Sequence, residues 1–263
     1  MQKIYLQEIH STNTFLLDAL SKGEEFKDET MVYTTNQTAG RGQIGNSWEA
    51  EKDKNIAFSI LLKPAFLAIR EQFLLSEITS IAIVEALSEI IADITDAEGF
   101  TTKKCCIKWP NDIYVGDDKI GGILIENSLQ GSTMKYSVVG VGVNINQTHW
   151  IGNAPNPTSL KLVLGRELNP LEVLDKMIEK FSHYYNLLKE RHKDEIHTRY
   201  LSLLYRNEGF HQYQDVATEK VFSARIISVE PSGFLHLEDM EGKTYSYMFK
   251  EVKFVLPCGV TKE

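Results

Sequence analysis

The spacing of apolar residues along the chain predicts two long helices and one short one. From residue 74 to residue 94, apolar side chains recur with a period of about 3.6, which is typical of one buried helix face. This face carries Leu74, Ile78, Ile81, Val84, Leu87, Ile91 and Ile94. A second face begins at Pro170, after the cap residue Asn169, and carries Leu171, Leu174, Met177, Ile178, Phe181, Tyr185 and Leu188. The short helix is expected to begin at the caps Ser11 and Thr12 and to stop at Gly23.

Shorter apolar segments predict strands. They are residues 30–35, 55–62, 105–109, 120–126 and 136–143. We expect 105–109 and 120–126 to be neighbours in a hairpin. After about Arg206, polar and apolar residues alternate from 216 to 256 around turn signals, which predicts a small all-β module. The pattern therefore predicts an α/β (α+β) main domain at residues 1–205 and a small C-terminal β-barrel domain at residues 206–263.

Composition narrows the class of protein. The chain has 263 residues, of which 43% are hydrophobic and 24% charged, as in ordinary globular proteins. A net charge of -8 argues against a nucleic-acid binder. Cys105, Cys106 and Cys258 show no CxxC spacing, so we expect reduced thiols and no zinc site. The N-terminus lacks a signal-peptide pattern, and no apolar run approaches the ~20 residues of a membrane span. We therefore expect a soluble, cytoplasmic protein.

A glycine-rich loop, Gly40-Arg41-Gly42-Gln43-Ile44-Gly45, fits the pattern G-x-G-x-x-G. In a dinucleotide-binding fold a helix must follow these glycines directly. Here residues 46–54 are almost wholly polar and run into a strand, so that interpretation fails. Two interpretations remain. The loop could wrap an anion with its backbone N–H groups and Arg41, or it could be a solvated surface turn.

The segment Lys108-Trp109-Pro110-Asn111-Asp112 begins at the end of the predicted apolar strand 105–109 and continues beyond it. A lysine there is costly to bury unless an anion meets it, which favours a binding site; an ordinary turn is the alternative. Glycines also occur inside the strand patterns, at Gly121-Gly122 and in Gly140-Val141-Gly142. Glycine in a strand marks either a ligand lying against the backbone or a bulge.

Several motifs together resemble the biotin–protein ligase family in order and spacing, from about residue 5 to residue 150. They are Ser11-Thr12-Asn13, residues 37–42 through Trp48, 108–112, Lys119-Ile120-Gly121-Gly122-Ile123-Leu124 and 140–144. The C-terminal module is similar to the family's SH3-like domain, with Lys250-Glu251-Val252 near its usual Gly-Glu-Val. The resemblance implies a mixed, largely antiparallel sheet flanked by helices, as in class II aminoacyl-tRNA synthetases, plus a small SH3-like β-barrel.

The resemblance also implies a reaction. An ATP-dependent ligase of this type activates biotin as biotinyl-5′-AMP and transfers it to a specific lysine of the biotin carboxyl carrier protein domain of a carboxylase. Lys108 and Arg41 are the implied catalytic residues. The implied biotin-binding residues are Ser11, Thr12, Asn13, Gln37, Arg41, Gly42, Lys108, Gly121 and Gly122. Those implied for ATP or the adenylate are Gly40, Arg41, Gly42, Trp48, Asn111, Lys119 and Asn144, and Mg²⁺ would be held by Asn111 and Asp112.

Some of these residues have an ordinary structural interpretation beside the functional one. Ser11 and Thr12 could serve only as helix caps, Gln37 could be a surface residue, and Trp48 could anchor a loop. Two other functions also stay open: a lipoate or octanoate ligase or transferase on the same fold, and a non-catalytic biotin-binding or regulatory protein. Retention of both Arg41 and Lys108 argues against the second.

Two departures from repressor-type members of the family change the expectations. Their loop carries several arginines, whereas this loop keeps only Arg41, so we expect it to hold the adenylate less firmly and to order later. Such members also place a winged helix-turn-helix domain before Ser11-Thr12-Asn13; because this motif lies close to the first residue of the sequence, we expect no such domain here. We therefore expect a ligase that does not bind DNA. Family members also dimerise through sheet edges, so a homodimer is one expected state.

Overall fold

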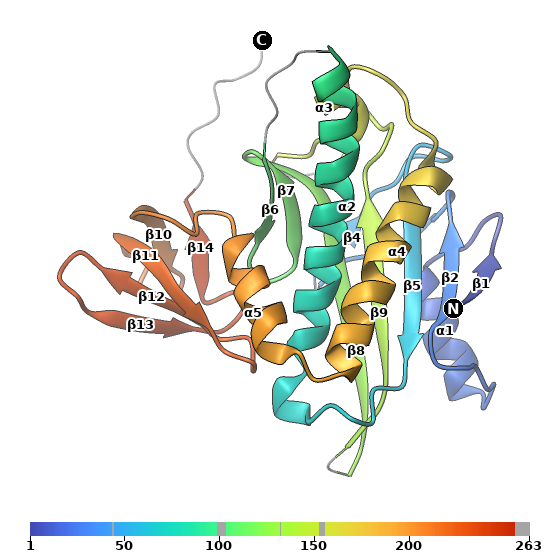
Figure 1. The fold of residues 1–263 in the computed structure, drawn as a ribbon, viewed down its shortest axis with the longest axis horizontal. Helices are drawn as coiled ribbons and strands as arrows, with labels where there is room; N and C mark the ends of the chain where they lie inside the picture. The colour runs from blue at the N-terminus through green and yellow to red at the C-terminus, as the bar shows by residue number, and fades with distance from the viewer. Residues whose placement is uncertain (44, 99–103, 132, 153–155, 256–263) are drawn as a thin grey trace.

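The described residues form a seven-stranded sheet, a five-stranded sheet and a small two-stranded sheet. Figure 1 shows the two larger sheets side by side. The computed structural model describes residues 1–43, 45–98, 104–131, 133–152 and 156–255. The larger sheet has seven strands in the order β1-β2-β5-β9-β8-β7-β6. All its described pairings are antiparallel except β1 with β2, which is parallel. This mixed, largely antiparallel sheet with flanking helices confirms the predicted fold class.

The elements of the main domain follow one another along the chain as β1 (Gln2–Tyr5), α1 (Thr12–Ser21), β2 (Thr30–Thr34), β3 (Gly40–Arg41), β4 (Ser47–Trp48), β5 (Ile56–Leu62), η1 (Ile69–Glu71), α2 (Leu74–Glu98), β6 (Cys105–Lys108), β7 (Asp112–Val115), β8 (Asp118–Gln130), β9 (Thr133–Val143), α3 (Leu160–Leu164), α4 (Pro170–Lys189) and α5 (Lys193–Ser202). The C-terminal part contains β10 (His211–Asp215), β11 (Val221–Val229), β12 (Leu235–Asp239), β13 (Thr244–Tyr247) and β14 (Val252–Phe254). The helices beginning at Thr12, Leu74 and Pro170 were all predicted.

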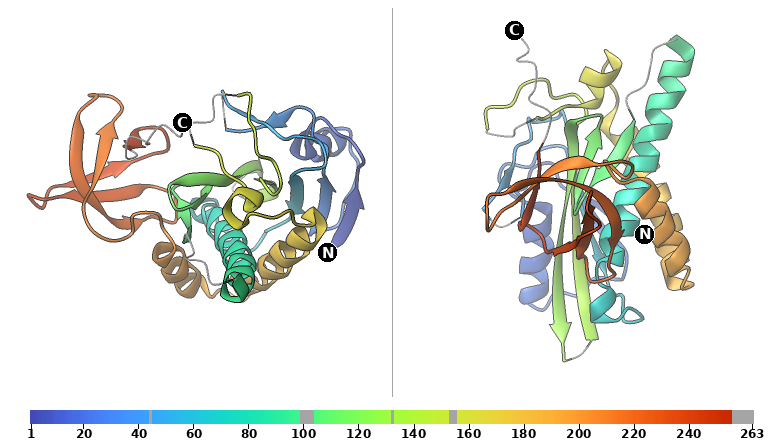
Figure 2. Two further views of the ribbon diagram at one scale, coloured as in Figure 1. Left: turned by 90° about the horizontal axis from the view of Figure 1, so that it is seen from above. Right: turned by 90° about the vertical axis from the view of Figure 1, so that its left-hand side faces the viewer.

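Side-chain alternation assigns a different role to each face of the large sheet. Alternate residues of β5, such as Phe58 and Ile60, pack into the main core with α2 and α4, whereas Leu61 packs with Leu16 of α1. Figure 2 shows α2 and α4 on one side of the sheet and α1 on the other. On β9, Val139 belongs to the main core and Val138 to the α1 side. The glycines at 140 and 142 therefore face the α1 side.

One predicted pairing is wrong. Residues 105–108 and 118–130 are not neighbours in a hairpin, because β7 lies between them and pairs with both. β7 has only four residues, between Pro110 and Gly116, and so short a segment gives little periodicity to detect. β1, α3 and α5 were also not predicted. Of the cysteines, Cys105 and Cys106 are free and buried, and burial raises their pKa values to about 11 and about 12; Cys258 lies outside the described residues.

The C-terminal strands form a five-stranded antiparallel sheet in the order β13-β12-β11-β10-β14. Its core is continuous with that of the main domain, since Tyr213, Leu235 and Leu237 belong to the same buried cluster as α2 and α4. The indole of Trp109 donates to the Gly233 carbonyl at 3.1 Å, which ties the end of β6 to the small domain. The small domain is thus held against the edge of the large sheet, close to the segment that carries Lys108.

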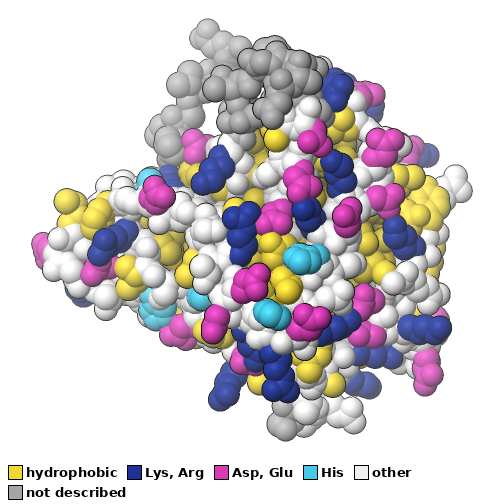
Figure 3. All heavy atoms as spheres, in the orientation of Figure 1, with side chains coloured by type: hydrophobic (Ala, Val, Ile, Leu, Met, Phe, Trp, Pro, Cys, Tyr) yellow, Lys and Arg dark blue, Asp and Glu magenta, His cyan; other side chains and the backbone are white. Residues whose placement is uncertain are grey.

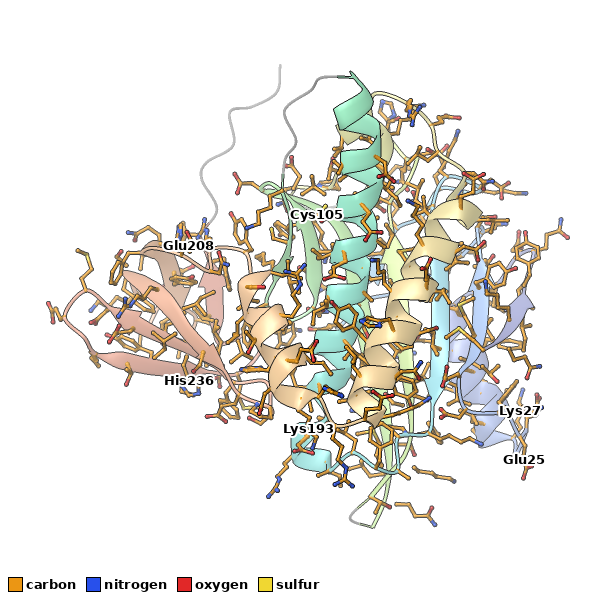
Figure 4. The ribbon with its side chains drawn as sticks, viewed as in Figure 1. Glu25, Lys27, Cys105, Lys193, Glu208 and His236 are labelled. Atoms are coloured by element: carbon orange, nitrogen blue, oxygen red, sulfur yellow. The ribbon has the colours of Figure 1, made fainter. Side chains whose placement is uncertain are left out.

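Ion pairs connect the helices on the outer face formed by α2, α4 and α5. In Figure 3, basic and acidic side chains lie intermingled over this face, and Arg199 of α5 pairs with Glu85 of α2 at 2.8 Å. Figure 4 shows Lys193 at the start of α5, where its Nζ lies 2.7 Å from a carboxylate oxygen of Glu71. No helix among the described residues is long and apolar enough to cross a membrane.

A buried pair between α2 and α5 gives the fold a pH dependence. Nδ1 of His197 lies 2.9 Å from Oε1 of Glu77, whose side chain is fully buried. The hydrogen bond to Glu77 raises the pKa of His197 above 6.5, and burial raises the pKa of Glu77 above 4.5. Raised folded-state pKa values stabilise the protein at low pH, and this stability is lost as pH rises through them.

We therefore expect the free energy of unfolding to fall as pH rises from 6.5 through the folded-state pKa of His197. Urea denaturation at a series of pH values measures this. The variant His197→Gln cannot titrate, so the difference between wild type and variant should shrink over that window. A difference that does not change with pH would contradict the assignment.

Candidate active site

A cavity of about 830 Å³ opens on the α1 side of the large sheet. Its wall combines α1, the β3–β4 hairpin, strands β8 and β9, the end of β6 and a segment of the small domain. Most residues proposed for the site from the sequence line it: Ser11, Thr12, Asn13, Gln37, Arg41, Gly42, Trp48, Lys108, Asn111, Asp112, Lys119 and Gly122. The structure thus brings together motifs that are distant in the sequence, since the side chain of Asn13 bonds the carbonyl of Leu124, 111 positions away.

A buried polar cluster forms one part of the wall, at the N-terminus of α1. The side-chain oxygen of Gln37 accepts from the backbone N–H of Thr12 at 2.9 Å. The Ser59 hydroxyl lies 2.7 Å from Oγ1 of Thr12 and 2.6 Å from Oδ1 of Asn13. Ser11 caps the helix, because its hydroxyl accepts from the N–H of Thr14. The structure therefore confirms Ser11 as a cap residue and places its neighbours in a network of uncharged donors and acceptors.

Two glycines of β9 make room for site side chains. A Cβ at Gly140 would lie 2.1 Å from Oδ1 of Asn13, and a Cβ at Gly142 would lie 2.6 Å from the indole of Trp48. Gly122 lies opposite Gly142 on β8, and a Cβ there would meet the same indole at 3.4 Å. These glycines are therefore sites of close packing, so Asn13 and Trp48 can lie flat against the sheet.

Lys108 ends β6 with its ammonium between two aromatic rings. Its Nζ lies 5.3 Å from the ring centre of Tyr114 and 5.3 Å from that of Phe254, which comes from the small domain. No carboxylate of the described residues lies at ion-pair distance from it. Burial lowers the pKa of Lys108, and Lys119 and Arg206 lower it further, whereas Asp112 opposes them. A half-buried cation held by rings rather than by a carboxylate is suited to meet an anionic ligand.

Asp112 and Lys119 line the cavity near Lys108. Oδ1 of Asp112 is 2.5 Å from Nζ of Lys119, and that ammonium is 5.9 Å from the ring centre of Trp48. The amide nitrogen of Asn111 donates to the Ile123 carbonyl at 2.6 Å, so its oxygen is oriented away from that strand. Among the described residues, no group of three or more His, Cys, Asp or Glu could hold a metal by itself. One carboxylate fits only an ion that brings other ligands, as Mg²⁺ does with nucleotide phosphates.

Arg41 is already occupied by a carboxylate that the sequence did not single out. Its guanidinium bonds both oxygens of Glu126, at 2.7 Å and 3.2 Å. The amide of Asn13 donates to the same carboxylate at 2.9 Å. Glu126 therefore joins β8, α1 and the hairpin behind the cavity wall. The strand alternation contained the signal, because Gly122, Leu124 and Glu126 lie on one face of β8.

Three predicted site residues do not line the cavity. A Cβ at Gly40 would lie 2.2 Å from the Trp48 carbonyl, so this glycine closes the hairpin. Gly121 lies against Ile113 and Val143 of the main core. Asn144 is buried, and its side chain donates to the Thr158 carbonyl at 3.0 Å. Their binding roles stay predictions, and Ile44 of the loop lies outside the described residues.

The small domain contributes a part of the wall that the sequence did not indicate. These lining residues are Val216, Phe249, Lys250, Val252, Lys253 and Phe254. They lie more than 70 positions after the other lining residues in the sequence, and no local pattern connects them. Only the packing of the small domain against the end of β6 brings them to the cavity.

The chain is similar to known proteins over most of this site. The model of the biotin/lipoate A/B protein ligase family matches residues 5–144. The bifunctional ligase/repressor BirA of Bacillus subtilis is 30% identical over 118 residues, 45% of this chain and 33% of that protein. A biotin–[acetyl-CoA-carboxylase] ligase of Paracoccus denitrificans is 28% identical over 183 residues, 68% of this chain and 71% of that protein. The match to BirA thus spans about a third of that protein's length.

Among solved structures, a biotin protein ligase from Aquifex aeolicus in complex with biotin and ATP superimposes with a TM-score of 0.74. It is 24% identical, and the superposition covers 96% of this chain and 97% of that one. At this identity the likeness shows a shared fold, which extends through the small C-terminal domain.

Proposed function

The chain belongs to the biotin/lipoate A/B protein ligase family, and from this premise we propose that it activates biotin with ATP and transfers the biotinyl group to a lysine of a carrier domain. The observation that carries the proposal is the pairing of two chemistries in one cavity. A buried, uncharged hydrogen-bonding cluster lies at α1, and a cation without a carboxylate partner among the described residues lies at the end of β6.

These two chemistries suit the two ends of biotin. Its ureido group both donates and accepts hydrogen bonds. The amide of Asn13 and the hydroxyls of Thr12 and Ser11 can also donate and accept, so they can pair with it. Its carboxylate is an anion that Lys108 can meet. The dithiolane ring of lipoate has no strong hydrogen-bonding group, so it would lie against this polar cluster without forming hydrogen bonds to it. An octanoyl chain would do the same. The cluster therefore favours biotin.

In the first half-reaction, a carboxylate oxygen of biotin attacks the α-phosphorus of ATP, and pyrophosphate leaves. Two anions must approach each other, so cations at the meeting point lower the barrier. Lys108 would hold the carboxylate and an α-phosphate oxygen, and Trp48 would pack against adenine. Mg²⁺, bound through the phosphates with Asp112 and Asn111 nearby, would neutralise further charge. The β3–β4 hairpin would shield the mixed anhydride from water.

In the second half-reaction, a lysine amine attacks the biotinyl carbonyl, forms an amide and releases AMP. We propose that the acceptor is the carrier domain of a biotin-dependent carboxylase, as the names of the relatives suggest. The net charge of -8 supports the expectation that the chain does not bind DNA, and a gel shift would test it. Cytoplasmic location and a homodimer also stay predictions.

ATP–pyrophosphate exchange tests the proposed function. We expect biotin to stimulate the incorporation of labelled pyrophosphate into ATP, whereas lipoate and octanoate should not, because of the three acids only biotin carries a ureido group that can form hydrogen bonds with the polar cluster. Each acid is tested at equal concentration with Mg-ATP, and a reaction without acid is the control. Exchange with lipoate or octanoate alone would establish the competing reaction. No exchange with any acid would favour a non-catalytic binding protein.

A further inference from the structure

Glu126 of β8 contacts two predicted site residues without lining the cavity itself. Its Oε2 accepts from Nδ2 of Asn13 at 2.9 Å, and its Oε1 accepts from the Arg41 guanidinium at 2.7 Å. Asn13 and Arg41 both line the cavity. A hydrogen bond to a carboxylate is roughly twice as strong as one between neutral groups. Glu126 can therefore influence a ligand through the side chains that it holds, rather than by touching the ligand.

The contacts of Asn13 determine which end of its amide faces the cavity. Its nitrogen lies 2.9 Å from the Glu126 carboxylate and 3.2 Å from the Leu124 carbonyl, and both of these partners accept only. Its oxygen accepts from the Ser59 hydroxyl at 2.6 Å. A hydroxyl both donates and accepts, so Ser59 would tolerate either orientation of the amide. The two acceptors therefore fix the orientation, and Glu126 is the charged one.

The oxygen of Asn13 lies over Gly140, a residue that lines the cavity. An amide oxygen can accept two hydrogen bonds, and the hydroxyl of Ser59 supplies one of them. No second donor to this oxygen is present among the described residues. The amide nitrogen, in contrast, is directed at Glu126 and Leu124. Asn13 therefore presents an acceptor, and not a donor, to a ligand at this point of the cavity.

We propose that Glu126 is a positioning residue for biotin. By holding the amide nitrogen of Asn13, its carboxylate keeps the amide oxygen toward the ligand, where this oxygen accepts from a ureido N–H. The negative charge behind the amide also polarises it, which makes the oxygen a stronger acceptor. Arg41 offsets that charge from the other side of the carboxylate. The inference rests on the proposed function, since it takes biotin as the substrate.

The substitution Glu126→Gln keeps the shape of the side chain and removes its charge. Asn13 then loses its charged acceptor, so its amide can rotate and turn a donor toward the ligand. We expect KM for biotin in pyrophosphate exchange to rise about three- to tenfold, the usual effect of losing one neutral hydrogen bond. KM for ATP, and kcat at saturating biotin, should stay unchanged. Calorimetric titration with biotin alone measures the same loss without turnover.

Glu238→Gln is the matched control. Glu238 pairs with Arg225 across β11 and β12 at 2.7 Å, its side chain is about as exposed as that of Glu126 (24% against 26%), and neither partner lines the cavity. This control should leave both KM values and kcat unchanged. Thermal unfolding of each variant reports on the fold. A lower Tm with an unchanged KM for biotin in Glu126→Gln would show a structural role alone and would overturn the proposal.

A double-mutant cycle with Asn13→Ala tests whether Glu126 acts through the amide. Asn13→Ala should itself raise KM for biotin, and in that background Glu126→Gln should raise it no further. If Glu126 acted by anchoring Arg41 or by supporting the fold, its loss would persist without the amide. That result would overturn the proposal while leaving the proposed function intact. Wild-type protein that shows no biotin-dependent exchange would overturn the proposed function, and this inference with it.

Discussion

Replacing Lys108 with alanine is expected to slow biotinyl-adenylate formation by about 10²–10³-fold, the usual effect of removing one preorganised group that stabilises transition-state charge. Lys108 has no carboxylate partner among the described residues, and two rings hold its ammonium in place. The variant should fold normally, because the change removes a partly desolvated charge and no ion pair of the described residues. The loss should therefore appear in kcat for biotin-dependent pyrophosphate exchange.

Lys104→Ala is the matched control for this prediction. Lys104 directly precedes β6 and is exposed, so the same substitution four residues earlier should leave exchange unchanged. Lys108→Arg should remain strongly impaired, since a planar guanidinium does not reproduce a compact ammonium between the rings of Tyr114 and Phe254. If Lys108→Ala exchanged pyrophosphate at the wild-type rate, the assignment of this end of the cavity would be wrong.

Adding a single methyl group at Gly142 is expected to weaken the use of ATP, and adding one at Gly140 is expected to weaken the use of biotin. At Gly142 the new Cβ would lie 2.6 Å from the Trp48 indole, and at Gly140 it would lie 2.1 Å from the Asn13 side chain. Both distances are too short, so the facing side chain must move, and a shift of about 1 Å at a site can lower the rate 10²-fold. Gly142→Ala should mainly raise KM for ATP, and Gly140→Ala should mainly raise KM for biotin.

The two variants are controls for each other, and Val139→Ala is a control for general damage to β9. Val139 faces the main core on the same strand, so its truncation should lower stability and leave both KM values unchanged. Steady-state pyrophosphate exchange, with ATP and biotin varied in turn, gives KM for each substrate in each of the two glycine variants. Equal effects of both glycine variants on both substrates would contradict the division of the cavity into a biotin end and a nucleotide end.

Much of the fold was predictable because the strongest signals are local. The periodic faces of α2 and α4 and the buried strand β5 follow from residue spacing alone. β7 was missed because its four residues give too little periodicity, and its absence led to the wrong hairpin between β6 and β8. Register within the sheet, by contrast, depends on which strands meet, and sequence spacing does not determine that.

The residues of the candidate site also fall into those that a local pattern predicts and those that depend on how the strands meet. Lys108 was predictable, since a lysine ending an apolar strand is unusual enough to need an anion. Gly121 lies on the core face of β8, and that face could be assigned only once the register with β9 was known. Lys250 of the small domain was missed because it reaches the cavity only through tertiary packing. Glu126, the partner of Arg41, was missed although strand alternation places it on the same face of β8 as Gly122. The expectation of a loop poor in free charge is sharpened by Glu126, which occupies its one described cation.

The central claim is that this cavity makes a biotinyl group transferable to a protein lysine. Its most direct test is the intact mass of a carboxylase carrier domain after incubation with the protein, biotin and Mg-ATP. We expect the mass of the carrier domain to increase by one biotinyl group, the increase to require ATP, and the increase to be lost when the acceptor lysine is replaced. A carrier mass that stays unchanged with biotin, but increases by one lipoyl or octanoyl group when that acid replaces biotin, would contradict it.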